Sequence, residues 1–229
     1  MRVNSKPALN YQSVAKIPDE SEILLTLVWP KTNVFQSNKY KRARLEGHNA
    51  LFWMARGAHS FLEPCDDNTH LDLIWHEESK GFRTKVFDRD LQIGLNIPEL
   101  ELYFCENEIK VPHSFWLDDR TPAYVEAWYL VELVHRDRDR DKFSTELPFS
   151  SPNMLMGDTE DHNASAFIEE LEALQQCFEK CIILFEQIAD SLSACGAIDE
   201  SKKVLVLKPE SFTLNRYFSP KSTQENVIS

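Results

Sequence analysis

The feature that most constrains this chain is an apolar repeat near its C-terminal end. Eight apolar residues follow one another at spacings that alternate between four and three: Phe167, Leu171, Leu174, Phe178, Cys181, Phe185, Ile188 and Leu192. Such spacing places the side chains on one face of a helix. Four more residues widen that face: Ile168, Cys177, Ile182 and Leu184. The repeat predicts a long helix over about 163–194. A face this wide favours packing of that helix on a sheet over a two-stranded coiled coil.

A second, shorter helix is expected over about 49–62. Its apolar residues recur at helical spacing: Leu51, Met54, Ala55, Ala58, Phe61 and Leu62. Gly47 and Gly57 weaken this prediction, because glycine inside a helix costs about 1 kcal/mol relative to alanine. Pro64 ends the helix, and a basic stretch, Lys39–Arg44, precedes it. We interpret that stretch as a solvated helix start or a contact for an acidic partner.

The middle of the chain shows the two-residue alternation of half-buried antiparallel strands. Expected strands lie near 71–76, 82–87, 99–104, 109–115 and 143–149, with short apolar runs near 23–29 and 203–207 as two more. The clearest candidate is Tyr124–His135. One side of that stretch is almost wholly apolar: Val125, Ala127, Tyr129, Val131 and Leu133. We therefore expect this side to face the core.

Together these elements predict an α+β fold, in which a mainly antiparallel sheet of about six to seven strands packs against the long helix and the shorter one. The length of 229 residues suits a single domain spanning 1–229, with loose ends at about 1–20 and 219–229. The element order resembles that of helix-grip domains, where a curved sheet wraps a long C-terminal helix around an apolar cavity. That resemblance concerns the fold alone and implies no particular function.

Three residues are candidates for holding a small apolar or aromatic ligand between sheet and helix. His113 alternates with Ile109, Val111 and Phe115 on a face assigned to the core, and Tyr129 lies on the apolar side of its own strand. Trp75 belongs to the strand near 71–76. Polar groups within an apolar lining are typical of ligand pockets, although a buried histidine or tyrosine with a satisfied hydrogen bond would give the same pattern.

The sequence predicts no metal site, no cofactor and no catalytic residue. His70 and His76 alternate on one strand face with Asp72, but six residues of strand separate the histidines by about 20 Å, too far to share an ion. His48 and His59 are about 16 Å apart along a helix. Glu126 and Glu132 are likewise too distant to act as a pair on a strand. No glycine-rich phosphate loop, GxSxG or HExxH motif occurs.

Charge and composition restrict the partners. The net charge of −12 makes nucleic acid and anionic membranes unfavourable partners. No apolar stretch approaches the length of a membrane span, and residues 1–7 do not have the pattern of a signal peptide. The five cysteines form no CxxC pair, so we expect reduced thiols and a cytoplasmic location.

Three functions stay open at this point. The first is a small binding domain with an apolar ligand between sheet and long helix. The second is an interaction or homodimerising module that uses the Phe167–Leu192 face. The third is an enzyme whose catalytic residues are dispersed along the chain, because missing motifs are weak evidence against one.

Overall fold

A computed structural model describes residues 32–151, 154–156, 160–195 and 198–220. Four helices occur in this part of the chain: α2 (Thr32–Gln36), α3 (Asn38–Phe61), α4 (Pro122–His135) and α5 (Ile168–Ala194). Short 3₁₀ turns lie at Thr69–Leu71, Arg140–Lys142 and Ser165–Phe167. None of these described helices is both long and apolar enough to cross a membrane. The predicted strand near 23–29 and the predicted loose end at 1–20 lie outside the described residues.

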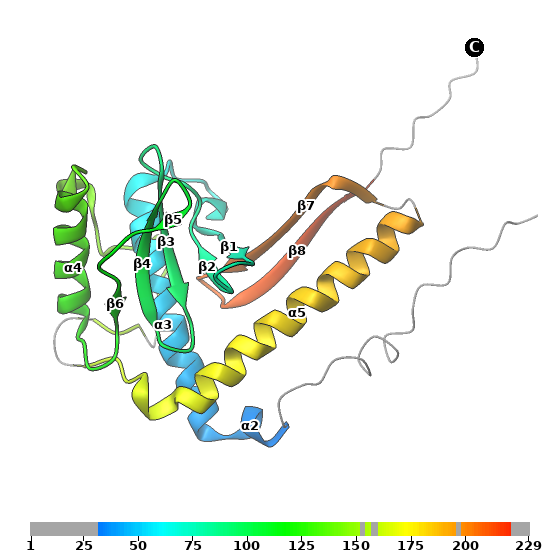
Figure 1. The fold of residues 1–229 in the computed structure, drawn as a ribbon, viewed down its shortest axis with the longest axis horizontal. Coiled ribbons are helices and arrows are strands. Elements are labelled where there is room, and N and C mark those ends of the chain that lie inside the picture. The colour runs from blue at the N-terminus through cyan, green and yellow to red at the C-terminus, as the bar shows by residue number, and fades with distance from the viewer. Residues whose placement is uncertain (1–31, 152–153, 157–159, 196–197, 221–229) are drawn as a thin grey trace, which may run out of the picture.

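Eight strands form one antiparallel sheet (Figure 1). They are β1 (Leu73–His76), β2 (Gly81–Arg83), β3 (Leu91–Asn96), β4 (Glu101–Glu106), β5 (Ile109–Lys110), β6 (Phe115–Trp116), β7 (Ile198–Lys208) and β8 (Thr213–Pro220). The order across the sheet is β5-β4-β3-β2-β1-β7-β8, and β6 pairs with β4 beside β5. The α+β class, the antiparallel sheet and both predicted helices are thereby confirmed.

Three helices cover one face of this sheet. Ile93 of β3 pairs directly with Phe104, and Phe82 pairs directly with Leu95 of the same strand. Leu95 lies two residues from Ile93 and therefore on the same side of β3, so Phe82, Ile93 and Phe104 share one face of the sheet. The ring of Phe82 contacts Phe178 of α5, with centroids 5.2 Å apart. Ile93 lies against Gly57 of α3, and the ring of Phe104 contacts Tyr129 of α4. The core therefore lies between the sheet and these helices.

Helix α3 begins eleven residues before the predicted start, so the basic stretch forms its first turns. The Ser37 side chain caps it by accepting the N–H of Tyr40. The two glycines that weakened the helix prediction lie where other elements approach closely. A Cβ at Gly57 would stand 2.1 Å from Ile93 Cδ1, and one at Gly47 would stand 3.2 Å from Leu174 Cδ2 of α5. Packing, rather than helix propensity, explains both glycines.

The apolar repeat of Phe167–Leu192 is buried to different degrees along its length. Its first four residues, Phe167, Leu171, Leu174 and Phe178, are buried in the chain's own core. Its later residues are partly buried where the β7–β8 hairpin runs alongside the helix (Figure 1). Homodimer formation through this face stays a prediction, but its N-terminal half is already covered.

The strand predicted over Tyr124–His135 is wrong, because this segment is α4. Val125, Tyr129 and Leu133 are buried at a spacing of four, which a strand face and a helix face share. Ala127 and Val131 distinguish the two, and both are exposed. The Thr121-Pro122 pair is a helix-start signal, with proline at the first helical position, and the sequence interpretation overlooked it.

Smaller differences concern the strands. The segment 143–149 is no strand, and the run near 109–115 divides into β5 and β6 with a loop between them. The segment near 82–87 is a strand only over Gly81–Arg83, followed by an isolated bridge from Phe87 to Leu91. Strands β3 and β8 were not predicted. Part of the end predicted to be loose, 219–220, belongs to β8, and the rest lies outside the described residues.

Candidate metal centre

The three predicted ligand-binding residues occupy different surroundings. Tyr129 is buried, and its hydroxyl donates to the Trp53 carbonyl at 2.8 Å. Burial raises the pKa of Tyr129 far above its ordinary value, so this hydroxyl stays protonated. Trp75 is half-buried, packs its ring edge-on against Phe82 and donates to Glu77. Ligand binding by these residues stays a prediction.

His113 differs most from its predicted place. It lies in the loop between β5 and β6, and 68% of its side chain is exposed, so its assignment to a core-facing strand is wrong. Its backbone has φ 72°, in the left-handed region that few residues other than glycine adopt. Trp128 of α4 fixes this conformation by donating from Nε1 to the His113 carbonyl at 3.0 Å.

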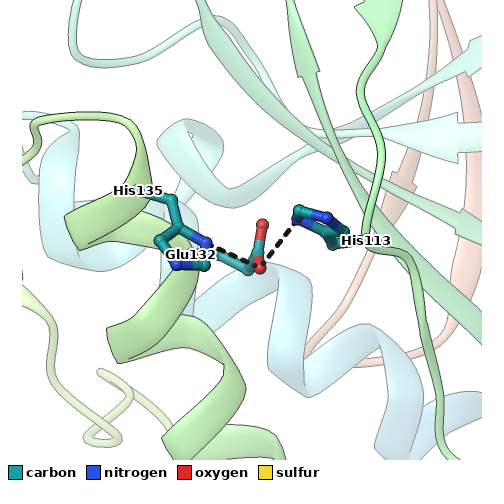
Figure 2. A group of neighbouring side chains, drawn as sticks. All are labelled: His113, Glu132 and His135. Carbon is teal, nitrogen blue, oxygen red and sulfur yellow. Dashed lines mark ion pairs between the residues drawn. The ribbon is translucent and has the colours of Figure 1, made fainter.

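The fixed loop brings His113 to two residues of α4. Glu132 and His135 are separated by three positions, so they share one face of the helix near its C-terminal end. Figure 2 shows the two histidines on either side of the Glu132 carboxylate. His113 Nδ1 lies 3.7 Å from Glu132 Oε1, and His135 Nδ1 lies 3.5 Å from the same oxygen. All three donor atoms lie within 4.8 Å of one another.

The carboxylate at the centre is buried and oriented by an arginine. Only 4% of the Glu132 side chain is exposed, while its Oε2 accepts from Arg136 Nη1 at 2.5 Å. Arg136 also donates to the Glu132 backbone carbonyl and forms an ion pair with Glu106 at 3.2 Å. Its guanidinium lies over the Phe104 ring. Oε2 is therefore committed to Arg136, and Oε1 is left facing the histidines.

The donor set and its spacing suit a transition-metal ion. Two imidazole nitrogens and one carboxylate oxygen are ligands of catalytic zinc and of non-haem iron sites. Zinc–nitrogen and zinc–oxygen bonds of about 2.1 Å in a tetrahedral arrangement separate neighbouring ligand atoms by about 3.4 Å. The two nitrogen–oxygen separations exceed that value by only a few tenths of an ångström. The two nitrogen atoms lie within 4.8 Å of each other, so the histidine side chains would have to move closer together around an ion.

The centre opens onto a groove of about 410 Å³, lined by both histidines, Glu106, Val111, Pro112 and Arg136. Because His113 and His135 are exposed while Glu132 is buried, an ion held here would keep part of its coordination sphere on the groove side. That arrangement corresponds to open metal sites, in which water or another ligand completes the set.

The sequence reasoning missed this centre because it placed 124–135 in a strand. On a strand, residues three apart point to opposite sides of the sheet, and Glu132 could not join His135. The Glu132-x-x-His135 pair was visible only with a helix in place. Nothing in the sequence indicated that His113 would reach the same helix.

Comparisons of this chain with protein-family models, with curated proteins and with solved structures find no match.

Proposed function

We propose that this protein binds a divalent transition-metal ion, such as Zn²⁺, through His113, Glu132 and His135. The observation that carries the proposal is a single buried carboxylate oxygen, Glu132 Oε1, flanked by two histidine Nδ1 atoms at 3.5 and 3.7 Å. Both separations are too long for good hydrogen bonds. They are close to the distance between neighbouring ligand atoms around a tetrahedral metal ion.

The surroundings support binding in three ways. Arg136 holds the second carboxylate oxygen, which favours coordination through Oε1 alone. Such an outer hydrogen-bond partner fixes the orientation of a ligand before the metal arrives. Trp128 fixes the loop that carries His113, so less conformational entropy is lost on binding. The imidazole-rich set favours zinc, cobalt, nickel or iron over magnesium or calcium, which prefer oxygen ligands.

A metal ion on the groove side would also supply a candidate catalytic centre for the enzyme hypothesis. An open coordination position allows a bound water whose pKa the metal lowers toward neutrality. The three ligands are dispersed along the chain, as that hypothesis requires. Metal binding must be established before any reaction is sought.

The decisive test is titration of the full chain with Zn²⁺ by calorimetry, and with Co²⁺ by visible absorption. Cys65 and Cys195 are exposed thiols that bind such ions adventitiously, so both are replaced by serine in every variant. We expect one equivalent of metal and an absorption spectrum without thiolate bands. Glu132→Gln and the double change His113→Ala, His135→Ala should each weaken binding more than about 100-fold, since even outer partners contribute about 10–100-fold.

The matched control is His76→Ala, a histidine of β1 that contacts Ser79 away from the cluster. It should bind metal like the parent protein. The proposal fails if the parent binds no metal, or if removing both cluster histidines leaves the affinity at the parent value. In that case the cluster is a set of ordinary ion pairs around Glu132.

A further inference from the structure

A buried arginine of α3 lies beside the N-terminal end of α4, and among the described residues it forms no ion pair within 4.0 Å. Arg56 of α3 is only 3% exposed. Its Nε donates to the Thr145 carbonyl at 2.9 Å, and its guanidinium lies over the Trp53 ring at 4.2 Å. Within the described residues no carboxylate comes within 4.0 Å of it, and its Nη atoms make no hydrogen bond. Burial lowers the pKa of Arg56 to about 10, and the nearby Tyr129 and Glu126 oppose this shift, so Arg56 is charged at neutral pH.

Arg56 borders a small cavity of about 90 Å³, together with Trp53, Ala123, Glu126 and Thr145. A volume of this size corresponds to about three water molecules, or to one small polyatomic ion. Glu126 and Thr145 are exposed, so the cavity communicates with solvent on their side. A buried cation is costly unless it is paired. Arg56 is near the charge of Glu126 but forms no close ion pair with it, so Nη atoms beside a space of this size indicate a binding site for an anion.

The N-terminus of α4 adds positive potential at the same place. Pro122 has no N–H, and Ala123 lies too early in the helix for its N–H to find an intrahelical acceptor. The N-cap Thr121 makes no side-chain capping bond, and the first turn holds no acidic residue. Helix N-termini with these features stabilise anions through free N–H groups and the helix dipole.

We propose that this cavity binds a small carboxylate, held in bidentate fashion by the Nη atoms of Arg56 at the N-terminus of α4. A planar guanidinium matches a planar carboxylate in geometry. The nearby negative charge of Glu126 disfavours a doubly charged ion such as phosphate. Ala123 and Glu132 are nine residues apart on α4, about 14 Å along the helix axis, so this carboxylate site is separate from the metal cluster.

The test follows the Nε–H of Arg56 by NMR while acetate is added to the full chain at constant ionic strength in sodium chloride. Hydrogen bonding to Thr145 slows exchange of this proton, and Arg56→Lys identifies its signal by removing it. We expect a saturable shift with acetate that chloride does not cause, and weaker binding of phosphate. Arg56→Lys keeps the positive charge but removes the pair of Nη donors that can bind both carboxylate oxygens. Acetate binding to this variant should therefore weaken about 10-fold, as measured by the shift of the Ala123 amide signal.

Glu126→Gln keeps the test informative if the Arg56 variant folds poorly. Glu126 and acetate are both negatively charged, so removing the Glu126 charge should tighten acetate binding about 3-fold, the effect of one exposed charge pair. Glu172→Gln, an exposed glutamate of α5, makes the same charge change elsewhere and should have no effect. The proposal is overturned if acetate acts no differently from chloride or phosphate binds more tightly. It is equally overturned if Glu126→Gln weakens binding or lowers the melting temperature, which would make Glu126 the resident counter-ion of Arg56.

Discussion

Glu132 accepts from Arg136 at 2.5 Å through one carboxylate oxygen and faces His135 at 3.5 Å through the other. Arg136 thus has two roles: it stabilises α4 by pairing with the buried Glu132, and it orients Glu132 for the proposed metal centre. Its two roles can be separated, because metal can replace part of the charge that Arg136 supplies to the buried carboxylate.

Arg136→Gln should destabilise the metal-free protein by about 3 kcal/mol, because Glu132 would keep a buried charge without its partner. Glu132→Gln should cost less, since Arg136 retains its ion pair with Glu106. Urea unfolding with a chelator present measures both. Zn²⁺ should recover part of the loss in Arg136→Gln and none in Glu132→Gln. Equal losses without recovery by zinc would contradict the double role.

Gly57→Ala should destabilise the fold by up to about 2 kcal/mol. Its Cβ would stand 2.1 Å from Ile93 Cδ1, and overpacking of this kind costs about 1–3 kcal/mol, against a gain of about 1 kcal/mol in helix propensity. Adding Ile93→Val removes the clashing methyl group and should restore stability in a double-mutant cycle. Gly47→Ala, whose nearest neighbour is 3.2 Å away, is the control and should be close to neutral. No coupling between Gly57 and Ile93 would refute this account.

His70 should make the protein less stable as the pH falls below about 6.5, the ordinary histidine pKa. Burial, with the nearby charges of His59 and Lys85, lowers the pKa of His70. The unfolded state therefore binds the proton first, and the stability present above the unfolded pKa is lost on acidification. His70 Nδ1 also accepts the Cys65 N–H, a bond that protonation of this nitrogen would break. The slope of unfolding free energy between pH 7 and 5 should flatten in His70→Ala and stay unchanged in His76→Ala.

Val131→Lys should change stability by no more than about 0.5 kcal/mol, because 51% of Val131 is exposed on the outer face of α4. Val125→Lys should prevent folding or cost more than about 4 kcal/mol, because Val125 is fully buried. Both residues share one side of the rejected strand, so the strand would make the two changes equally harmful. Circular dichroism and urea unfolding of the two variants decide between helix and strand.

Repeating patterns carried most of the fold information in the sequence. The repeat from Phe167 to Leu192 identified α5 because alternating spacings of four and three fit no strand. The alternation near 71–76 and 99–104 likewise located β1 and β4. The pattern on α5 succeeds because burial of one face is a local, periodic property of the chain, whereas β4 is buried on both faces from Glu101 to Cys105.

The apolar pattern of α4 did not distinguish a helix from a strand, and tertiary structure alone assembled the site on that helix. Val125, Tyr129 and Leu133 fit a strand and a helix equally well, and the exposure of Ala127 and Val131 in the structure separates the two. His113 reaches Glu132 because a loop adopts a positive φ and Trp128 holds its carbonyl, a contact between segments that no periodicity encodes. The sequence determined which faces are apolar, whereas packing decided which polar groups those faces bring together.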